Sequence, residues 1–221
     1  MILQLLKKQR RQILIDIDTQ RDFLLGCGSA SVRNHKKVLA NVRRVMAWAR
    51  HSDVRIISTC EVHRNNNGYS ATDYCLDGTP GQKKIRYTIL SKRVSFAADS
   101  NTDLPVDLLW RNRQIIFNKR CADPFEEPRI ERALSEVEAD EFIVMGAAAE
   151  GAVKATVLGL LRRGKKVSVV VDAVGLYKRR AARLAFRIME TMGARLIDTK
   201  ELAGISHLRG TGICGCAICR G

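Results

Sequence analysis

Aromatic residues are scarce in this chain, and it has no long hydrophobic run. Aromatic side chains make up 5% of the residues, too few for a platform on which nucleic-acid bases stack. No apolar run reaches the roughly 18 residues that a membrane-spanning helix needs. The first residues, MILQLLKKQRRQ, place a short apolar stretch before the basic one, which is the reverse of a secretory signal. We therefore expect a cytoplasmic protein with no membrane partner.

Acidic residues are outnumbered by basic ones. The chain has 23 Asp and Glu against 38 Lys and Arg, for a formal net charge of +15. Such a field attracts polyanions, which makes nucleic acid a candidate partner. The alternative is a solvated basic surface, because the excess charge is spread over several short runs and none is long enough for a binding arm. Composition alone leaves both interpretations open.

Short apolar runs and helical periodicity dominate the rest of the sequence, which has 221 residues, 46% of them hydrophobic. Runs rich in β-branched residues predict buried parallel strands, over residues 12–17, 54–58, 114–117, 141–145, 166–171 and 194–198. Apolar residues at helical spacing predict helices, over residues 38–49, 129–137, 153–163 and 178–192. Residues 65–105 look irregular, with one strand-like stretch at 85–90.

Strands that alternate with helices at short spacing predict one α/β domain of three layers. We expect an open, mostly parallel, Rossmann-like sheet of six strands with helices on both faces, over residues 1–202. Ligands in such sheets bind beyond the carboxyl ends of the strands. Asp18, Lys119 and the turn at Gly146 all follow or end predicted strands, so we expect them to lie together. Residues 203–221 form a separate Gly- and Cys-rich tail.

Several stretches share their order and spacing with one family. They read DTQRDF from Asp18, LDGTPGQKKI from Leu76, NKRCADPF from Asn118, and GAAAEGAV from Gly146, followed by a helical pattern and GKKVSVVVDAVG. Together they resemble the isochorismatase-like cysteine hydrolases over about residues 12–200. The resemblance implies the same three-layer α/β fold.

The resemblance also implies an active site of an aspartate, a lysine and a cysteine. A cysteine at a helix N-terminus beside a lysine has a lowered pKa and acts as a nucleophile, while the aspartate carries its proton. These positions map onto Asp18, Lys119 and residue 152, which is alanine here. We expect Asp18 and Lys119 within hydrogen-bonding distance, with the Cβ of Ala152 facing them. The family's oxyanion hole, shaped by a non-proline cis peptide, maps onto Ala147 and Ala148.

Three interpretations of the missing cysteine stay open. In the first, the protein is a pseudoenzyme that keeps the pocket and binds an unknown small molecule. In the second, another nucleophile acts, either Cys121 or a water activated by Asp18. In the third, the reaction needs no covalent intermediate, as in vinyl ether cleavage. Family members are often oligomeric, which implies a homo-oligomer, and no organic cofactor is expected.

Two places in the sequence carry residues of the kind that bind metals. Nicotinamidase-like members hold a metal through an Asp-x-His pair and further histidines. The corresponding place reads Glu61-Val62-His63 here, with Tyr74 where such members have a histidine. This replacement disfavours a metal of the family type.

The chain has seven cysteines, an odd number, and four of them are scattered, which is typical of reduced thiols in a cytosol. The tail carries the other three, with the spacing H-x6-C-x-C-x2-C formed by His207, Cys214, Cys216 and Cys219. Four such ligands suit a closed tetrahedral zinc site. The alternative is a reduced, redox-active thiol cluster. A zinc knuckle on a basic protein also favours contact with nucleic acid.

Overall fold

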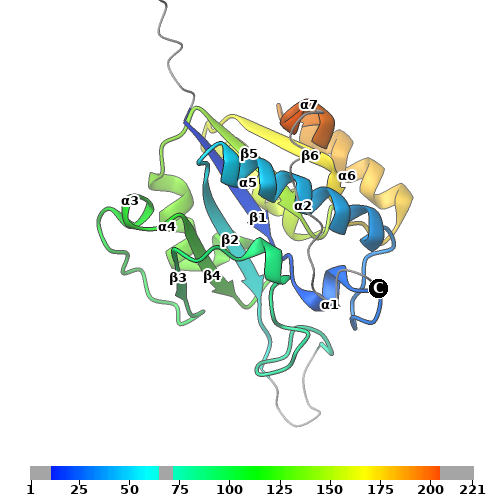
Figure 1. Ribbon diagram of the computed structural model, residues 1–221, viewed down its shortest axis with the longest axis horizontal. Helices are drawn as coiled ribbons and strands as arrows, with labels where there is room; N and C mark the ends of the chain where they lie inside the picture. The colour runs from blue at the N-terminus through cyan, green and yellow to red at the C-terminus, as the bar shows by residue number, and fades with distance from the viewer. Residues whose placement is uncertain (1–10, 65–71, 205–221) are drawn as a thin grey trace, which may run out of the picture.

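The computed structural model describes residues 11–64 and 72–204, and seven strands in them form one parallel sheet (Figure 1). The strand order is β3-β4-β2-β1-β5-β6-β7, and every neighbouring pair is parallel. The strands are β1 (Gln12–Ile17), β2 (Arg55–Glu61), β3 (Arg93–Phe96), β4 (Gln114–Lys119), β5 (Glu141–Gly146), β6 (Val167–Val174) and β7 (Arg195–Ile197).

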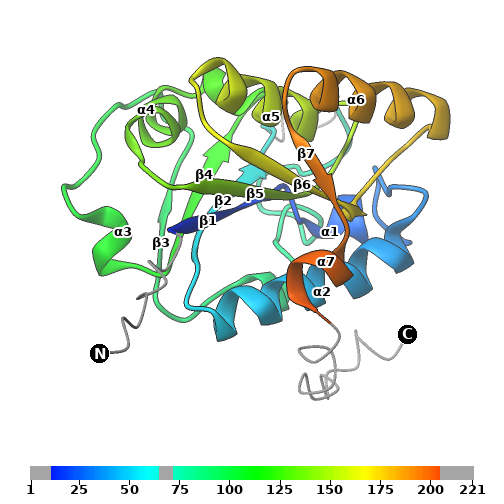
Figure 2. The same cartoon turned by 90° about the horizontal axis from the view of Figure 1, so that it is seen from above.

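Helices cover both faces of the sheet, as the predicted three-layer fold requires. Figure 2 shows α4, α5 and α6 on one side and α2 and α7 on the other. The α-helices are α1 (Arg21–Leu24), α2 (His35–His51), α3 (Leu108–Arg111), α4 (Pro128–Glu136), α5 (Ala152–Arg162), α6 (Arg179–Thr191) and α7 (Thr199–Ala203). None of the helices in the described ranges is long and apolar enough to cross a membrane.

The predicted count of six strands is wrong by one, because β3 joins the edge of the sheet. Its sequence, RVSF, alternates exposed and half-buried side chains and pairs with β4. A short edge strand of this kind has no apolar run, so hydrophobic patterning does not reveal it. Phe96 anchors it by stacking on Phe117 of β4, with ring centroids 5.3 Å apart.

The strand-like stretch at residues 85–90 is not a strand. Its centre is a 3-10 turn, η1, over Arg86–Thr88. The backbone N–H of Thr88 donates to the carbonyl of Ile85 at 2.9 Å, and its hydroxyl donates to the same oxygen at 2.8 Å. Local bonds of this kind compete with the ladder of a sheet.

Side-chain alternation along the strands builds two main cores, besides a small cluster of Cys60, Val62 and Ile116. Leu14 and Ile56 face α2, whereas Ile15 and Ile57 belong to the core under α4, α5 and α6. Because successive strand residues point to opposite faces, the last residues of each strand also divide between the two sides. This division decides which polar side chains meet at the carboxyl edge.

Candidate active site

Asp18 and Lys119 meet in a buried ion pair at the carboxyl edge of the sheet. Asp18 directly follows β1 and Lys119 ends β4, on either side of β2. Neither side chain is exposed, and Lys119 Nζ lies 2.7 Å from Asp18 Oδ2. The hydroxyl of Thr59 on β2 donates to Asp18 Oδ1 at 2.6 Å. The prediction that the two residues meet is confirmed, and their catalytic role stays a prediction.

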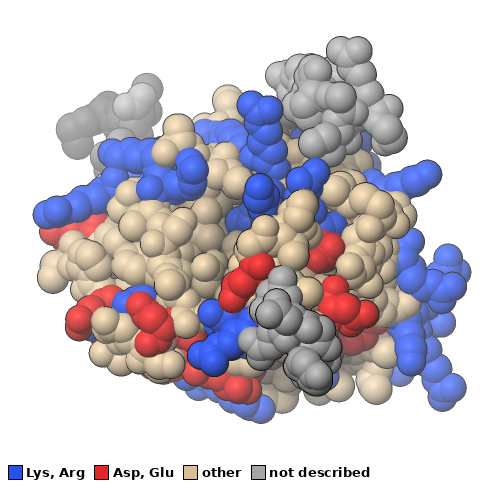
Figure 3. Space-filling view, turned by 90° about the horizontal axis from the view of Figure 1, so that it is seen from below, with Lys and Arg blue, Asp and Glu red and all other residues tan. Residues whose placement is uncertain are grey.

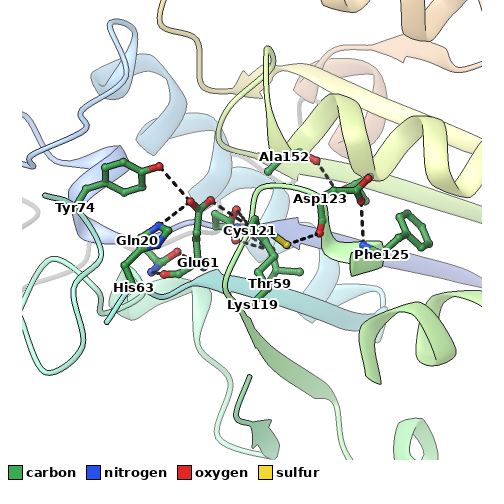
Figure 4. A network of polar contacts seen from close by, with 12 residues as sticks. Gln20, Thr59, Glu61, His63, Tyr74, Lys119, Cys121, Asp123, Phe125 and Ala152 are labelled. Atoms are coloured by element: carbon green, nitrogen blue, oxygen red, sulfur yellow. Dashed lines mark hydrogen bonds and ion pairs between the residues drawn. The ribbon is translucent and has the colours of Figure 1, made fainter. Parts of the chain in front are cut away.

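Glu61, the last residue of β2, is a second carboxylate beside Lys119 (Figure 4). Its Oε2 lies 3.3 Å from Lys119 Nζ. Its Oε1 lies 2.9 Å from His63 Nε2 and accepts a hydrogen bond from the Tyr74 hydroxyl at 3.2 Å. Sequence reasoning placed Glu61 in a metal motif and missed this role. The available signal was its position at the end of a strand, in register with Lys119.

The cluster pushes the pKa values of its two carboxylates in opposite directions. Burial raises the pKa of Asp18, and Lys119 offsets only part of that effect. Burial also acts on Glu61, but Lys119 and His63 outweigh it and hold the pKa of Glu61 below its usual range. Two carboxylates separated in this way take different roles, and the one with the raised pKa is the better proton carrier. Asp18 is therefore the group suited to acid–base work.

Lys119 stays charged although it is buried. Burial alone would favour the neutral amine, but Asp18 and Glu61 outweigh it and raise the pKa of Lys119. Its Nζ also donates to the carbonyl of Cys121 at 2.9 Å. The ammonium group is thus held in one place by oxygen atoms from several segments of the chain. It can orient a carbonyl oxygen or stabilise developing negative charge nearby.

Ala152 begins α5 and is buried, and the turn before it has the conformation that the resemblance implies. The peptide between Ala147 and Ala148 is cis. Gly146 has φ +125, and a Cβ there would lie 1.8 Å from the carbonyl oxygen of Ile17. No side chain fits at that position, so β5 passes into the turn directly against β1. Figure 4 shows Ala152 at the start of its helix in the same close-up as Lys119. The oxyanion-hole role of Ala147 and Ala148 stays a prediction.

Cys121 is poorly suited to replace the missing nucleophile. Burial and a hydrogen bond with Glu126 raise the pKa of this thiol to about 12. Its Sγ donates to the carbonyl of Asp123 at 3.2 Å. Since the thiolate is the nucleophile, such a thiol is almost entirely unreactive near neutral pH. The other alternative, a water activated by Asp18, stays a prediction.

The donor set does not fit a metal of the family type. Both oxygens of Glu61 already face Lys119, His63 or Tyr74. Burial and Glu61 raise the pKa of Tyr74 to about 12, so its hydroxyl keeps its proton and donates. Within residues 11–64 and 72–204, no three His, Cys, Asp or Glu side chains are arranged to hold a metal ion. The proposed zinc ligands His207, Cys214, Cys216 and Cys219 lie outside the described residues.

A second buried ion pair, also missed from the sequence, lies near the first. Lys84 Nζ is 2.9 Å from Asp16 Oδ2 and donates to the Thr19 hydroxyl at 2.8 Å. The hydroxyl of Ser58 donates to the same carboxylate oxygen at 2.9 Å. Lys84 belongs to the LDGTPGQKKI stretch, so this pair fastens that loop to β1.

Comparisons with known proteins agree with this fold. The family model described as the Isochorismatase domain matches residues 12–201. The nicotinamidase of Escherichia coli strain K12 is 26% identical over 210 residues, covering 86% of this chain and 98% of that protein. The crystal structure of the Pyrococcus horikoshii pyrazinamidase in complex with zinc has a TM-score of 0.66 at 24% identity, covering 85% of this chain and 99% of that one. A Caenorhabditis elegans ribonuclease has a TM-score of 0.60 at 22% identity, covering 89% and 82%.

Proposed function

Because this chain belongs to the isochorismatase family, we propose that it binds a small carbonyl compound beside Asp18 and Lys119 without cysteine-based catalysis. One observation carries the proposal. The buried cluster of Asp18, Lys119 and Glu61 is complete, whereas residue 152, at the mapped nucleophile position, is alanine. A methyl group forms no acyl intermediate, and loss of a nucleophile removes most of the rate of covalent catalysis.

Stability alone is a competing explanation for the surviving ion pair. Removing one member of a buried pair leaves an unpaired charge, so both residues are retained even without a ligand. Position favours a functional site, because the pair lies at the carboxyl ends of parallel strands, where ligands bind in sheets of this kind. Burial raises the pKa of Asp18, and its carboxylate lies 2.7 Å from the ammonium of Lys119. This arrangement suits a group that exchanges a proton with a ligand.

The relatives suggest the ligand class. The E. coli relative is a nicotinamidase and the P. horikoshii neighbour a pyrazinamidase. We therefore propose an aromatic carboxamide or the corresponding acid, with its carbonyl oxygen directed at Lys119. The rings of His63 and Tyr74, edge to face at 5.1 Å, offer an aromatic wall on the Glu61 side of the cluster.

Titration calorimetry with nicotinamide and nicotinic acid tests the proposal, together with an assay for released ammonia. We expect binding of at least one compound, with no ammonia above the uncatalysed rate. Asp18→Asn should weaken binding, whereas Asp53→Asn, an exposed control, should not. Absence of binding by both compounds would contradict the ligand class. Ammonia release that survives alkylation of all thiols would instead support a water activated by Asp18.

We also propose, from the sequence, that the tail binds one zinc ion through His207, Cys214, Cys216 and Cys219. A short Gly- and Cys-rich terminus has too little apolar mass to fold alone, and zinc supplies on the order of 10 kcal/mol in comparable small sites. Metal analysis of purified protein should give one zinc per chain, lost in Cys216→Ser/Cys219→Ser and kept in Cys27→Ser. Zinc that persists in the double variant would contradict the tail site.

A further inference from the structure

A basic groove of about 1390 Å³ lies on the α2 side of the sheet, between α2, residues 82–89 and the edge formed by β2, β4 and β3. It is separate from the candidate active site. Cys60 and Val62 line the groove, whereas Glu61 between them belongs to the ion-pair cluster. Likewise, Asn118 lines the groove, whereas Lys119 belongs to the ion-pair cluster. Because side chains alternate along a strand, the groove and the candidate active site lie on opposite faces of the sheet, near the carboxyl ends of the same strands.

Positive charge surrounds this groove without compensation. Seven Lys and Arg line it, and none of its lining residues in the described ranges is Asp or Glu. Only Lys84 among the seven forms an ion pair within those ranges, with Asp16. The other six are Arg21, Lys36, Arg43, Lys83, Arg86 and Arg93. Unpaired charges of one sign in a concave site focus the field and attract an anion.

One of these cations is already ordered in the groove wall. The guanidinium of Arg43 lies over the ring of Tyr87, 5.0 Å from its centroid. Its Nε is buried and has no hydrogen-bond partner among the described residues. Figure 3 shows Lys and Arg side chains also projecting around the carboxyl-edge face of the molecule.

The floor of the groove is apolar, and this limits what fits. Aliphatic side chains form it, among them Leu39, Ile85, Ile89 and Ile116. Inorganic phosphate has no apolar part to bury there. Double-stranded nucleic acid keeps its base faces stacked inside and offers the floor only phosphate and sugar. A single strand presents phosphates at regular intervals together with unstacked base faces, and the volume exceeds the roughly 300–1000 Å³ of ordinary small-molecule pockets.

We propose that this groove binds single-stranded nucleic acid. The phosphates lie against the six unpaired cations and the bases contact the aliphatic floor. Recognition is mostly electrostatic and tolerant of sequence, because the described lining residues include no cluster of aromatic rings to read individual bases. The affinity must therefore fall steeply with salt.

Fluorescence anisotropy of the full chain with a labelled oligouridylate tests the proposed binding. A length of about 16 nucleotides is suitable, because it is the upper end of site sizes for such grooves. The variant Lys83→Glu/Arg86→Glu reverses two exposed groove charges. The matched control Arg183→Glu/Arg187→Glu reverses two exposed charges on α6, on the other face of the sheet. We expect the groove variant to bind about tenfold or more weakly and the control to stay within about threefold. The log–log salt slope should fall by about 1.4, since each single-strand phosphate contact contributes about 0.7.

A second groove variant, Arg21→Glu/Lys36→Glu, should weaken binding equally. It keeps the test valid if the first variant fails to fold. Oligothymidylate of the same length serves as a DNA arm, and groove-dependent binding of either strand supports the proposal. Equal loss in the groove and α6 variants would overturn it, because only net charge would then matter. Polyglutamate bound as tightly, with the same dependence on the groove, would also overturn it in favour of an acidic protein partner. So would an absence of oligonucleotide binding at low salt.

Discussion

Lys119→Met should lower the free energy of unfolding by about 3–5 kcal/mol, the usual cost of breaking a buried ion pair from one side. The variant leaves two carboxylates, Asp18 and Glu61, facing each other in a site where Asp18 and Lys119 have no exposed surface. Methionine fills the volume, so the loss reports the missing charge and not a cavity. Urea unfolding followed by circular dichroism measures it. Lys36→Met, an exposed lysine with no ion pair to any described residue, is the control and should cost less than about 0.5 kcal/mol.

The same variant should show a characteristic pH dependence. Without Lys119, the buried carboxyl of Asp18 binds a proton more tightly in the folded than in the unfolded chain. A carboxyl with a raised folded-state pKa makes the fold more stable as pH falls, because the native state then binds more protons. The deficit of Lys119→Met relative to wild type should therefore shrink between about pH 8 and pH 5. In the wild type, the pKa of Lys119 is raised, so its contribution is full below the unfolded value and is lost only at strongly alkaline pH. A deficit independent of pH would show that repacking, not charge, causes the loss.

Ala152→Cys should create a reactive thiol at residue 152, where the wild-type chain has a methyl group. The new side chain lies at the start of α5, where the helix dipole favours a thiolate, and the family resemblance places it beside the Lys119 ammonium, which favours one too. By contrast, burial raises the pKa of Cys60 and the pKa of Cys121 to about 12. Residue 152 should therefore react with iodoacetamide at least about a hundredfold faster than these two thiols near neutral pH, since the thiolate fraction changes tenfold per pH unit below the pKa. Peptide mapping by mass spectrometry gives the rate at each site.

Ala155→Cys, about one turn further along the same helix, is the matched control for this gain. It shares the helix but not the position at its N-terminus, and it should label more slowly. Adding Lys119→Met to Ala152→Cys should remove most of the acceleration, which ties the effect to the ammonium group. Equal labelling of residues 152 and 155 would contradict the mapping of the nucleophile position. Release of ammonia from nicotinamide by Ala152→Cys alone would support the proposed ligand class.

Much of the fold and part of the site could be predicted because the signals are local. The apolar runs that became β1, β2, β4, β5, β6 and β7 are visible in the sequence, and Asp18 and Lys119 follow or end two of them. The edge strand β3 was missed because its four residues are exposed or half-buried. The stretch at residues 85–90 was misread because Thr88 closes a turn there. Pattern reasoning thus failed where burial is partial or where a side chain bonds to its own backbone.

The sequence by itself determined that residue 152 carries a methyl group and that the chain has 15 more cationic than anionic side chains. No packing arrangement can supply a thiol to that position or remove that charge. Only the tertiary structure decided which charges face one another. It paired Lys119 with both Asp18 and Glu61, paired Lys84 with Asp16, and left six other cations around one groove without an ion pair to any described residue. The reason is that strand order and side-chain alternation bring together residues far apart in the chain, and neither is encoded in any local stretch.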